Sequence, residues 1–172
     1  GRTQGRLSTG LKVSSALDDA SAFFTARSLS NRAADLTGVK GKVDQAISAV
    51  SNAVQAIDSA SKIVEQIRGI AESAKSAATA AERSTLGNQA ELLAVQLNNL
   101  INDSSYNGVN LLKATPDNLE VNFNEDSTVE LTVAGSNLTA SNLGADISTV
   151  TNNWGTVGDI NADVNEYASA LG

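Results

Sequence analysis

An apolar residue recurs at every seventh position through six consecutive heptads in the first half of the chain. A second apolar residue follows each by three positions, which is the spacing of a coiled-coil seam. The first set is Val43, Val50, Ile57, Val64, Ala71 and Ala78, and the second is Ala46, Ala53, Ala60, Ile67, Ala74 and Ala81. Most of these side chains are small or branched, so partner helices can approach closely. The pattern predicts a slender helical core, typical of proteins that hold, space or polymerise. An intramolecular core is the preferred interpretation for positions such as Val50 and Ile57, and the alternative is that the seam includes surfaces that pack against other subunits.

No proline interrupts residues 17–80, where Ala, Ser, Lys, Gln and Glu dominate. We predict one long helix here, spanning on the order of 90 Å at about 1.5 Å per residue. The segment Ser15-Ala-Leu-Asp18 has the spacing of a capping box at its start, after an irregular lead-in over residues 1–14. Asp18 and Asp19 would lie in the first turn, where the helix dipole favours anions. We interpret them as a helix start rather than a cation site.

A break is expected around residues 82–87. Leu86, Leu93 and Leu100 then recur every seven residues, which predicts a second helix over about residues 86–104. The short connection makes this helix an antiparallel neighbour of the first. Tyr106-Asn107-Gly108 should close it with a tight turn, because Asn-Gly supplies the positive φ angles that such a turn needs.

The period changes between residues 119 and 133, after the single proline at Pro116. Two alternating apolar runs flank a linker at residues 124–128, which predicts a β-hairpin. The runs are Leu119, Val121 and Phe123, and Val129, Leu131 and Val133. Each run has one apolar face, so the hairpin should pack on the helices. Acidic residues near its turn are interpreted as a solvated edge that discourages strand pairing.

Helical spacing returns at Val157, Ile160, Val164, Tyr167 and Leu171. It predicts a third helix from about residue 147 or 157 to the end, lying along the first and continuing in the parent protein. Trp154, at the irregular junction before it, is interpreted as a packing residue rather than a sugar platform. The fold class is therefore mainly α: an elongated antiparallel coiled-coil helical bundle with a small β-hairpin packed on it, in one domain over residues 1–172.

The composition of the chain disfavours several classes of partner and of chemistry. The net charge of −7 and scattered basic residues argue against nucleic acid or an anionic membrane as partner, and no apolar stretch approaches the roughly 20 residues of a membrane span. The chain has no Cys and no His, so thiolates and the commonest general base and metal ligand are missing. We predict no enzyme activity, cofactor or metal.

The lack of Met indicates a trimmed or processed segment. Two matches to N-glycosylation sequons, at residues 102–104 and 137–139, carry little weight because such short motifs arise often by chance.

Three segments resemble bacterial flagellin. Residues 6–20 are similar to the family's R-L-S-S-G-L-x-x-x-x-A-x-D-D-A segment, and the others are Val64-Glu-Gln-Ile-Arg-Gly-Ile-Ala71 and Tyr106-Asn-Gly-Val-Asn-Leu-Leu112. The hairpin, Ser141-Asn-Leu-Gly144 and Ala168-Ser-Ala-Leu-Gly172 add to the likeness, which is weakest at about residues 145–160.

This resemblance implies a secreted structural subunit of the flagellar filament, outside the cell, with other flagellin subunits as partners. Flagellins pair their N- and C-terminal segments in an outer tube domain, and larger members insert variable domains after the hairpin. Here that gap is short, so a minimal flagellin core is expected. Both terminal coils are expected to be absent, so this segment should not polymerise normally. An export chaperone would bind the missing C-terminal part.

The resemblance also marks a patch that host Toll-like flagellin receptors recognise. Recognised members read roughly Q-R-V-R-E-L where this chain has Glu65-Gln-Ile-Arg-Gly-Ile70, so the first arginine corresponds to Gln66 and the leucine to Ile70. Arg68 is retained, and the acidic contact of the second helix falls on Gln89. Because Gln66 stands where recognised members have arginine, the patch lacks a guanidinium group with five N–H donors that could anchor the receptor. We hypothesise weak or no recognition; the alternative is that these are ordinary exposed helix residues.

Other functions remain open at this point. A hook-associated protein at the hook–filament junction shares the architecture, although such proteins commonly carry Asp-Asp-Pro where this chain has Asp18-Asp19-Ala20. A flagellin-like polysaccharide-binding protein of the cell surface would need aromatic sugar platforms, and aromatic residues make up only 3% of the chain. The helical hairpin of a chemoreceptor is disfavoured by the strands predicted at residues 119–133.

Overall fold

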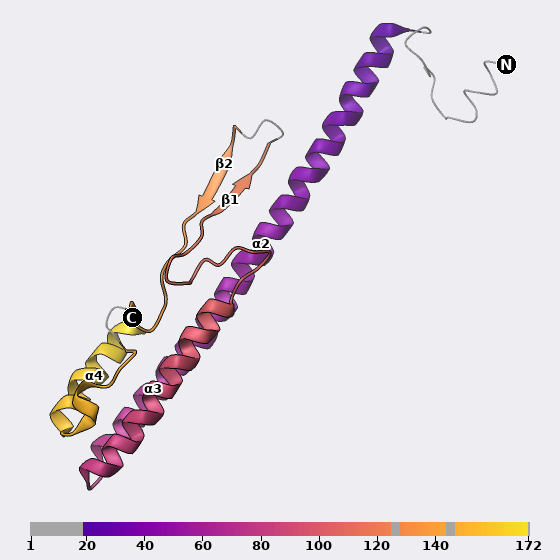
Figure 1. The fold of residues 1–172 in the computed structure, drawn as a ribbon. Coiled ribbons are helices and arrows are strands. Elements are labelled where there is room, and N and C mark those ends of the chain that lie inside the picture. The colour runs from indigo at the N-terminus through magenta and orange to yellow at the C-terminus, as the bar shows by residue number, and fades with distance from the viewer. Residues whose placement is uncertain (1–18, 125–127, 144–146, 172) are drawn as a thin grey trace, which may run out of the picture. The chain divides into compact units, whose positions relative to one another are not determined.

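The computed structural model describes residues 19–124, 128–143 and 147–171 (Figure 1). By their contacts the residues form two compact units. The first holds the chain up to Gln45 together with Val121–Leu131, and the second holds Ala46–Glu120 and Thr132–Gly172. Three α-helices, a short 3-10 turn and a two-stranded antiparallel sheet make up the regular structure of the described residues. The predicted class, mainly helical with a small hairpin, is confirmed.

Helix α2 covers Ala20–Lys75 and is the long helix that the sequence predicts. Asp19 precedes it, and the Asp19 carboxylate accepts a hydrogen bond from the Ala22 backbone N–H at 3.0 Å. Asp19 therefore acts as the N-cap of the helix rather than lying inside its first turn. The capping box expected at residues 15–18 lies outside the described residues.

Helix α3 covers Ala80–Asp103, so the break between the helices comes earlier than predicted. Thr79 and Glu82 form a reciprocal capping box: the Thr79 hydroxyl accepts from the Glu82 N–H, and the Glu82 carboxylate accepts from the Thr79 N–H. The hydrogen bond from Thr79 lowers the pKa of Glu82. The predicted break came too late because it was placed by the leucine repeat, which begins only at Leu86.

The early break shortens the predicted seam. Ala78 lies in the connection between the helices and Ala81 lies in the first turn of α3, and both are exposed. The other members of the second heptad set are buried along α2, namely Ala46, Ala53, Ala60, Ile67 and Ala74.

The first heptad set is only partly buried, which corrects the prediction that its members form the core. Val64 and Ala71 are 2% and 0% exposed, whereas Val50 and Ile57 are 37% and 39% exposed; Val43, in the first unit, is half-buried. Near the start of the second unit, the residues buried beside the second heptad set are instead Ala49, Ala56 and Ile63, each one position before a member of the first set. In a straight α-helix each heptad position rotates about the axis by about 20° per heptad, because the helix has 3.6 and not 3.5 residues per turn. The buried face therefore moves along α2 from the positions of Ala49, Ala56 and Ile63 to those of Val64 and Ala71.

One apolar core joins the elements of the second unit. The close approach of α2 and α3 depends on alanines, and larger side chains from α3, α4 and the connecting segments fill the remaining space. Its fully enclosed members are Ile67, Ala71, Ala74, Ala94, Leu97, Ile101, Ala140, Trp154 and Ile160.

A tight turn and a buried asparagine close the end of α3. Asn107 and Gly108 have φ angles of 50° and 82°, and Tyr106 and Val109 exchange backbone hydrogen bonds across them, as the Asn-Gly motif predicts. The Asn110 amide donates to the carbonyls of Ile101 at 2.8 Å and Asn102 at 3.0 Å. Asn110 thus binds carbonyls of the last turn of the helix, and the Ile101 carbonyl also accepts from the Ser104 N–H and hydroxyl.

The predicted hairpin consists of β1 (Leu119–Asn122) and β2 (Glu130–Val133). Val121 is buried, and Leu119 and Val133 are half-buried. Nearer the turn, Phe123, Val129 and Leu131 are 46–55% exposed. The apolar residues of the hairpin are therefore buried or half-buried near its base and exposed near its turn.

Helix α4 covers Val157–Ala170, in agreement with the later of the two predicted starts. Thr156 and Asp159 form a second capping box, and the hydrogen bonds from Thr156 lower the pKa of Asp159. Ile160, Val164 and Tyr167 are buried as the helical spacing predicts, whereas Val157 is 41% exposed.

Removing a core side chain of α3 should destabilise the protein far more than removing an exposed one. Leu97 is 0% exposed, so Leu97→Ala is expected to lower the free energy of unfolding by about 3 kcal/mol through lost burial and a residual cavity. Leu92→Ala is the matched control, because Leu92 on the same helix is 69% exposed and its loss should cost less than about 0.5 kcal/mol. Urea denaturation followed by circular dichroism at 222 nm measures both, and equal effects would contradict the assigned core.

Candidate functional site

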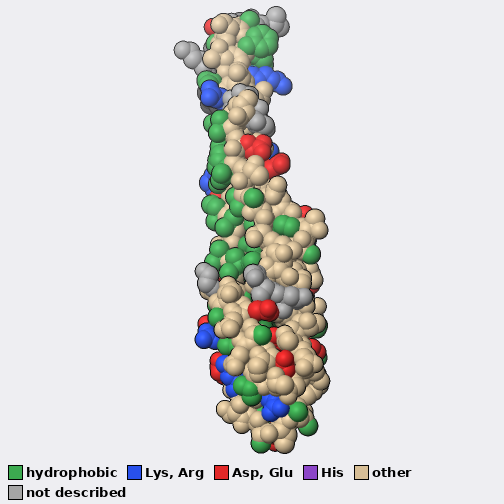
Figure 2. All heavy atoms as spheres, turned by 90° about the vertical axis from the view of Figure 1, so that its left-hand side faces the viewer, with side chains coloured by type: hydrophobic (Ala, Val, Ile, Leu, Met, Phe, Trp, Pro, Cys, Tyr) green, Lys and Arg blue, Asp and Glu red, His purple; other side chains and the backbone are tan. Residues whose placement is uncertain are grey.

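A stripe of exposed apolar residues follows α2 beside its buried face. It consists of Ile47, Val50, Val54 and Ile57, which are 37–60% exposed. Their spacing of three, four and three residues places them on one face, roughly 100° around the helix from the buried alanines. Figure 2 shows hydrophobic side chains in a line along one side of the upper part of the view, with Lys and Arg groups at its edge. The stripe has the pattern of a helix-packing seam, and the described residues leave it open to solvent.

Other apolar side chains are exposed on the helices. Leu92 and Val95 of α3 are 69% and 54% exposed. Within the first unit, Phe24, Leu29 and Leu36 of α2 are 49–62% exposed. Single exposed apolar residues are common, but repeated ones at helical spacing are typical of surfaces that bind other protein segments.

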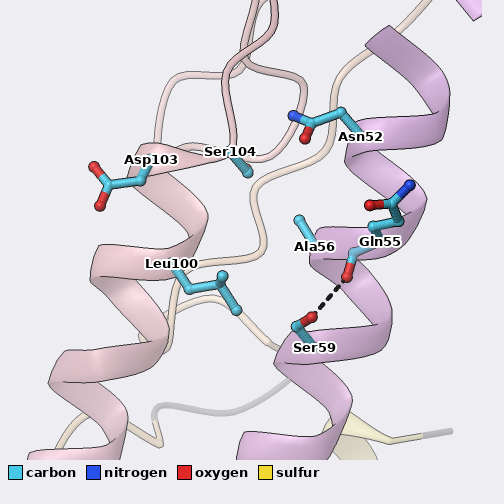
Figure 3. Close-up of a pocket in the computed structure, with 7 residues that line it drawn as sticks. All are labelled: Asn52, Gln55, Ala56, Ser59, Leu100, Asp103 and Ser104. Atoms are coloured by element: carbon cyan, nitrogen blue, oxygen red, sulfur yellow. Dashed lines mark hydrogen bonds between the residues drawn. The ribbon is translucent and has the colours of Figure 1, made fainter. Parts of the chain in front are cut away.

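A small pocket of about 230 Å³ opens between α2 and α3 (Figure 3). Its hydroxyl groups bond to backbone carbonyls: Ser59 Oγ donates to Gln55 at 2.8 Å and Ser104 Oγ donates to Ile101 at 2.7 Å. The lining residues are Asn52, Gln55, Ala56, Ser59, Leu100, Asp103 and Ser104. This set combines one exposed carboxylate with amides and bonded hydroxyls, and it contains no nucleophile paired with a base.

The junction before α4 contains a left-handed turn. The 3-10 segment η1 (Thr151–Trp154) includes three consecutive residues with positive φ: Asn152 at 47°, Asn153 at 50° and Trp154 at 53°. Asparagine tolerates this region, but a bulky residue such as tryptophan seldom adopts it. Trp154 is 0% exposed, which confirms the prediction that it is a packing residue.

A buried carboxylate of α4 holds this turn. Asp163 is 1% exposed and accepts hydrogen bonds from the Trp154 indole Nε1–H at 2.7 Å and the Thr151 backbone N–H at 2.8 Å; the Thr151 hydroxyl donates to its other oxygen. This role was not predicted from the sequence. Asp163 lies three residues after Ile160 and four before Tyr167, so a charge on the apolar face of the last helix was the available signal.

Helix α3 contributes the other side of the junction. The Arg83 guanidinium donates to the carbonyls of Gly155 at 2.8 Å and Trp154 at 3.3 Å. The Asn153 amide donates to Ser84 Oγ at 2.7 Å. A side-chain carbon added at Gly87 would lie 3.5 Å from the Trp154 ring and 3.1 Å from Val150, so the glycine lets the indole approach the helix.

Tyr167 is the other buried aromatic of α4, at 1% exposure. Its hydroxyl has no hydrogen-bond partner among the described residues. Burial raises the pKa of this hydroxyl, and the nearby carboxylates of Asp163, Glu166 and Glu91 act in the same direction. Tyr167 therefore stays protonated at any physiological pH and packs as an aromatic.

The structure separates the residues of the receptor-like patch. Gln66 and Ile70 are one turn apart on one face of α2, while Arg68 is displaced by roughly 200° from Gln66 around the axis. Gln66, Arg68 and Gln89 are exposed, and Ile70 is half-buried against the core. Whether this patch is recognised stays a prediction.

Metal-ligand clusters and membrane spans are both missing from the described part of the chain. No group of three or more carboxylates there is arranged to hold a metal ion. No described helix combines the length and apolar character needed to cross a membrane.

Comparison with known proteins identifies a family and solved structures of similar fold. Residues 2–117 match the family model described as the bacterial flagellin N-terminal helical region. The fold is similar to the crystal structure of Bacillus cereus flagellin, with a TM-score of 0.61 and 16% sequence identity over 74% of this chain and 73% of that one. A search by sequence among curated proteins gave no match.

Two glycine-to-alanine substitutions should have different effects. Nothing lies within 4 Å of a side-chain carbon at Gly69 of α2, so Gly69→Ala should raise the free energy of unfolding by about 1 kcal/mol through helix propensity. Gly87→Ala gains the same propensity but crowds Val150 and Trp154, so it should be less stable than Gly69→Ala by about 1 kcal/mol or more. Thermal and urea denaturation of the two variants compare them, and an equal gain in both would show that the indole does not need Gly87.

Proposed function

Since the chain belongs to the bacterial flagellin family, we propose that it is a structural subunit of the flagellar filament, polymerising with other copies through coiled-coil helical contacts to serve motility. The exposed stripe Ile47, Val50, Val54 and Ile57 carries this proposal. A helix with one buried seam and a second open one is built to pack against more than one neighbour. We accordingly place the protein outside the cell, on the flagellum, with other flagellin subunits as its partners.

The proposed role is mechanical and not catalytic. Alanine at the helix contacts allows close approach, and small side chains leave room for slight changes of packing between neighbouring helices. The outer faces of α2 carry Ser, Gln, Lys and Asp residues, which suit adjustable polar contacts in a large assembly. The pocket between α2 and α3 offers no paired acid and base that would favour an enzyme.

Placing a charge in the open stripe should prevent assembly without unfolding the subunit. In the full-length protein, Val54→Glu is expected to abolish filaments, because burying an unpaired carboxylate in a helix contact is costly. Its effect on the stability of the isolated chain should stay within about 0.5 kcal/mol, since Val54 is 50% exposed. Electron microscopy under assembly conditions counts filaments, with circular dichroism as the folding check.

Gln55→Glu provides the matched control. It adds the same charge one residue further along α2, on an exposed position outside the stripe, and should leave assembly intact. Normal filaments from Val54→Glu would remove the stripe from the proposed mechanism. Failure of the unaltered full-length protein to form tubular polymers would count against the filament function itself.

We also propose that the receptor-like patch does not bind a host Toll-like flagellin receptor. Gln66 and Gln89 lack the charges of the recognised pattern, although both side chains are exposed and able to make contacts. The receptor ectodomain should show no nanomolar binding to this chain in surface plasmon resonance. The double variant Gln66→Arg/Gln89→Glu should gain at least about tenfold in affinity, the effect of a charge-assisted contact. Nanomolar binding by the unaltered chain would overturn this proposal.

A further inference from the structure

The left-handed turn at residues 152–154 is not stabilised by its own sequence alone. Three consecutive residues other than glycine adopt positive φ, and one of them is a tryptophan. Such conformations are disfavoured for L-residues and persist only where the surroundings over-determine them. The backbone within the turn contributes a hydrogen bond from the Gly155 N–H to the Asn152 carbonyl at 3.0 Å.

The groups that hold the turn come from the two helices on either side of it. From α4, Asp163 accepts from Trp154 Nε1 at 2.7 Å and from the Thr151 N–H at 2.8 Å. From α3, Arg83 donates to the Gly155 carbonyl at 2.8 Å and Ser84 accepts from Asn153 at 2.7 Å. The turn therefore bridges two helices that are far apart in sequence.

Asp163 makes the turn and α4 depend on each other. If α4 left the core, the indole N–H and the Thr151 donors would lose their acceptor. If the turn relaxed to ordinary φ angles, the Asp163 carboxylate would stay 1% exposed without its three donors. Either change alone leaves buried polar groups unpaired, which is more costly than opening both together.

We propose that the turn and α4 form a latch, residues 150–171, that opens and closes as one cooperative unit while α2 and α3 stay paired. The first turn of α3 has its own stabilisation, because the capping box of Thr79 and Glu82 involves no residue of the latch. Ala94, Leu97 and Ile101 of α3 are 0% exposed in the core that also contains Ile67 and Ala71 of α2. The last helix is thus the part of this unit that can detach and dock again without unfolding the rest.

Hydrogen exchange followed by mass spectrometry on the 172-residue chain tests the latch. Asp163→Asn replaces one acceptor oxygen with an NH2 group that faces N–H donors. Exchange of residues 150–156 and 157–171 should accelerate together, on the order of 10- to 100-fold, the loss expected for hydrogen bonds to a buried charge. Residues 46–74 and 90–101 should keep their exchange rates. Asp58→Asn, at an exposed position of α2, is the matched control and should change neither segment.

A second pair of variants isolates the backbone strain. Asn153→Ala and Asn153→Gly both lose the hydrogen bond to Ser84, but only alanine is disfavoured at a φ of 50°. Asn153→Ala should open both segments about fivefold more than Asn153→Gly. Faster exchange in the turn with α4 unchanged would overturn the proposal, because the turn would then be a local loop. Equal acceleration in all three helices would also overturn it, because the latch would not be separate from the α2–α3 pair.

Discussion

Close approach of α2 and α3 through alanine is the constraint on which the second unit depends. Ala60, Ala71 and Ala74 of α2 and Ala90 and Ala94 of α3 are at most 5% exposed, so the contact is narrow and each side chain buries little surface. Such a contact leaves much of each helix uncovered. The larger residues Ile67, Leu97 and Ile101 are fully enclosed in the same core and add apolar burial that alanine cannot supply.

The narrow contact also explains how one helix can present two seams. Because the buried stripe follows the straight helix and not the strict heptad, Val50 and Ile57 turn away from the core of the unit. They join Ile47 and Val54 in the exposed stripe. Residues that a sequence repeat assigns to one seam are thus divided between the buried core and an exposed apolar surface.

The junction at Trp154 fixes where the last helix begins relative to α3, whose buried face carries several small side chains. Gly87 gives the indole room on α3, and Asp163 ties the same ring to α4. Polar groups carry the specificity here because alanine-rich surfaces offer few features that fix a helix in one register. Trp154 takes part in both the apolar core and the polar junction, since its ring is enclosed by the core and its indole N–H donates to Asp163 of the last helix.

The sequence by itself determined which segments are helical, the position of the hairpin, the Asn107-Gly108 turn and the family resemblance, because these depend on local spacing and local φ preferences. It also contained the Thr79–Glu82 capping box, a local signal that the leucine repeat obscured. Tertiary structure alone decided which side of α2 is buried, since the orientation of a helix depends on the partners placed around it. It likewise decided the role of Asp163, because Thr151 and Trp154 become its donors only when the chain turns back on α4. Local spacing fixes the conformation of the backbone, whereas burial and buried hydrogen bonds require groups that the fold brings together.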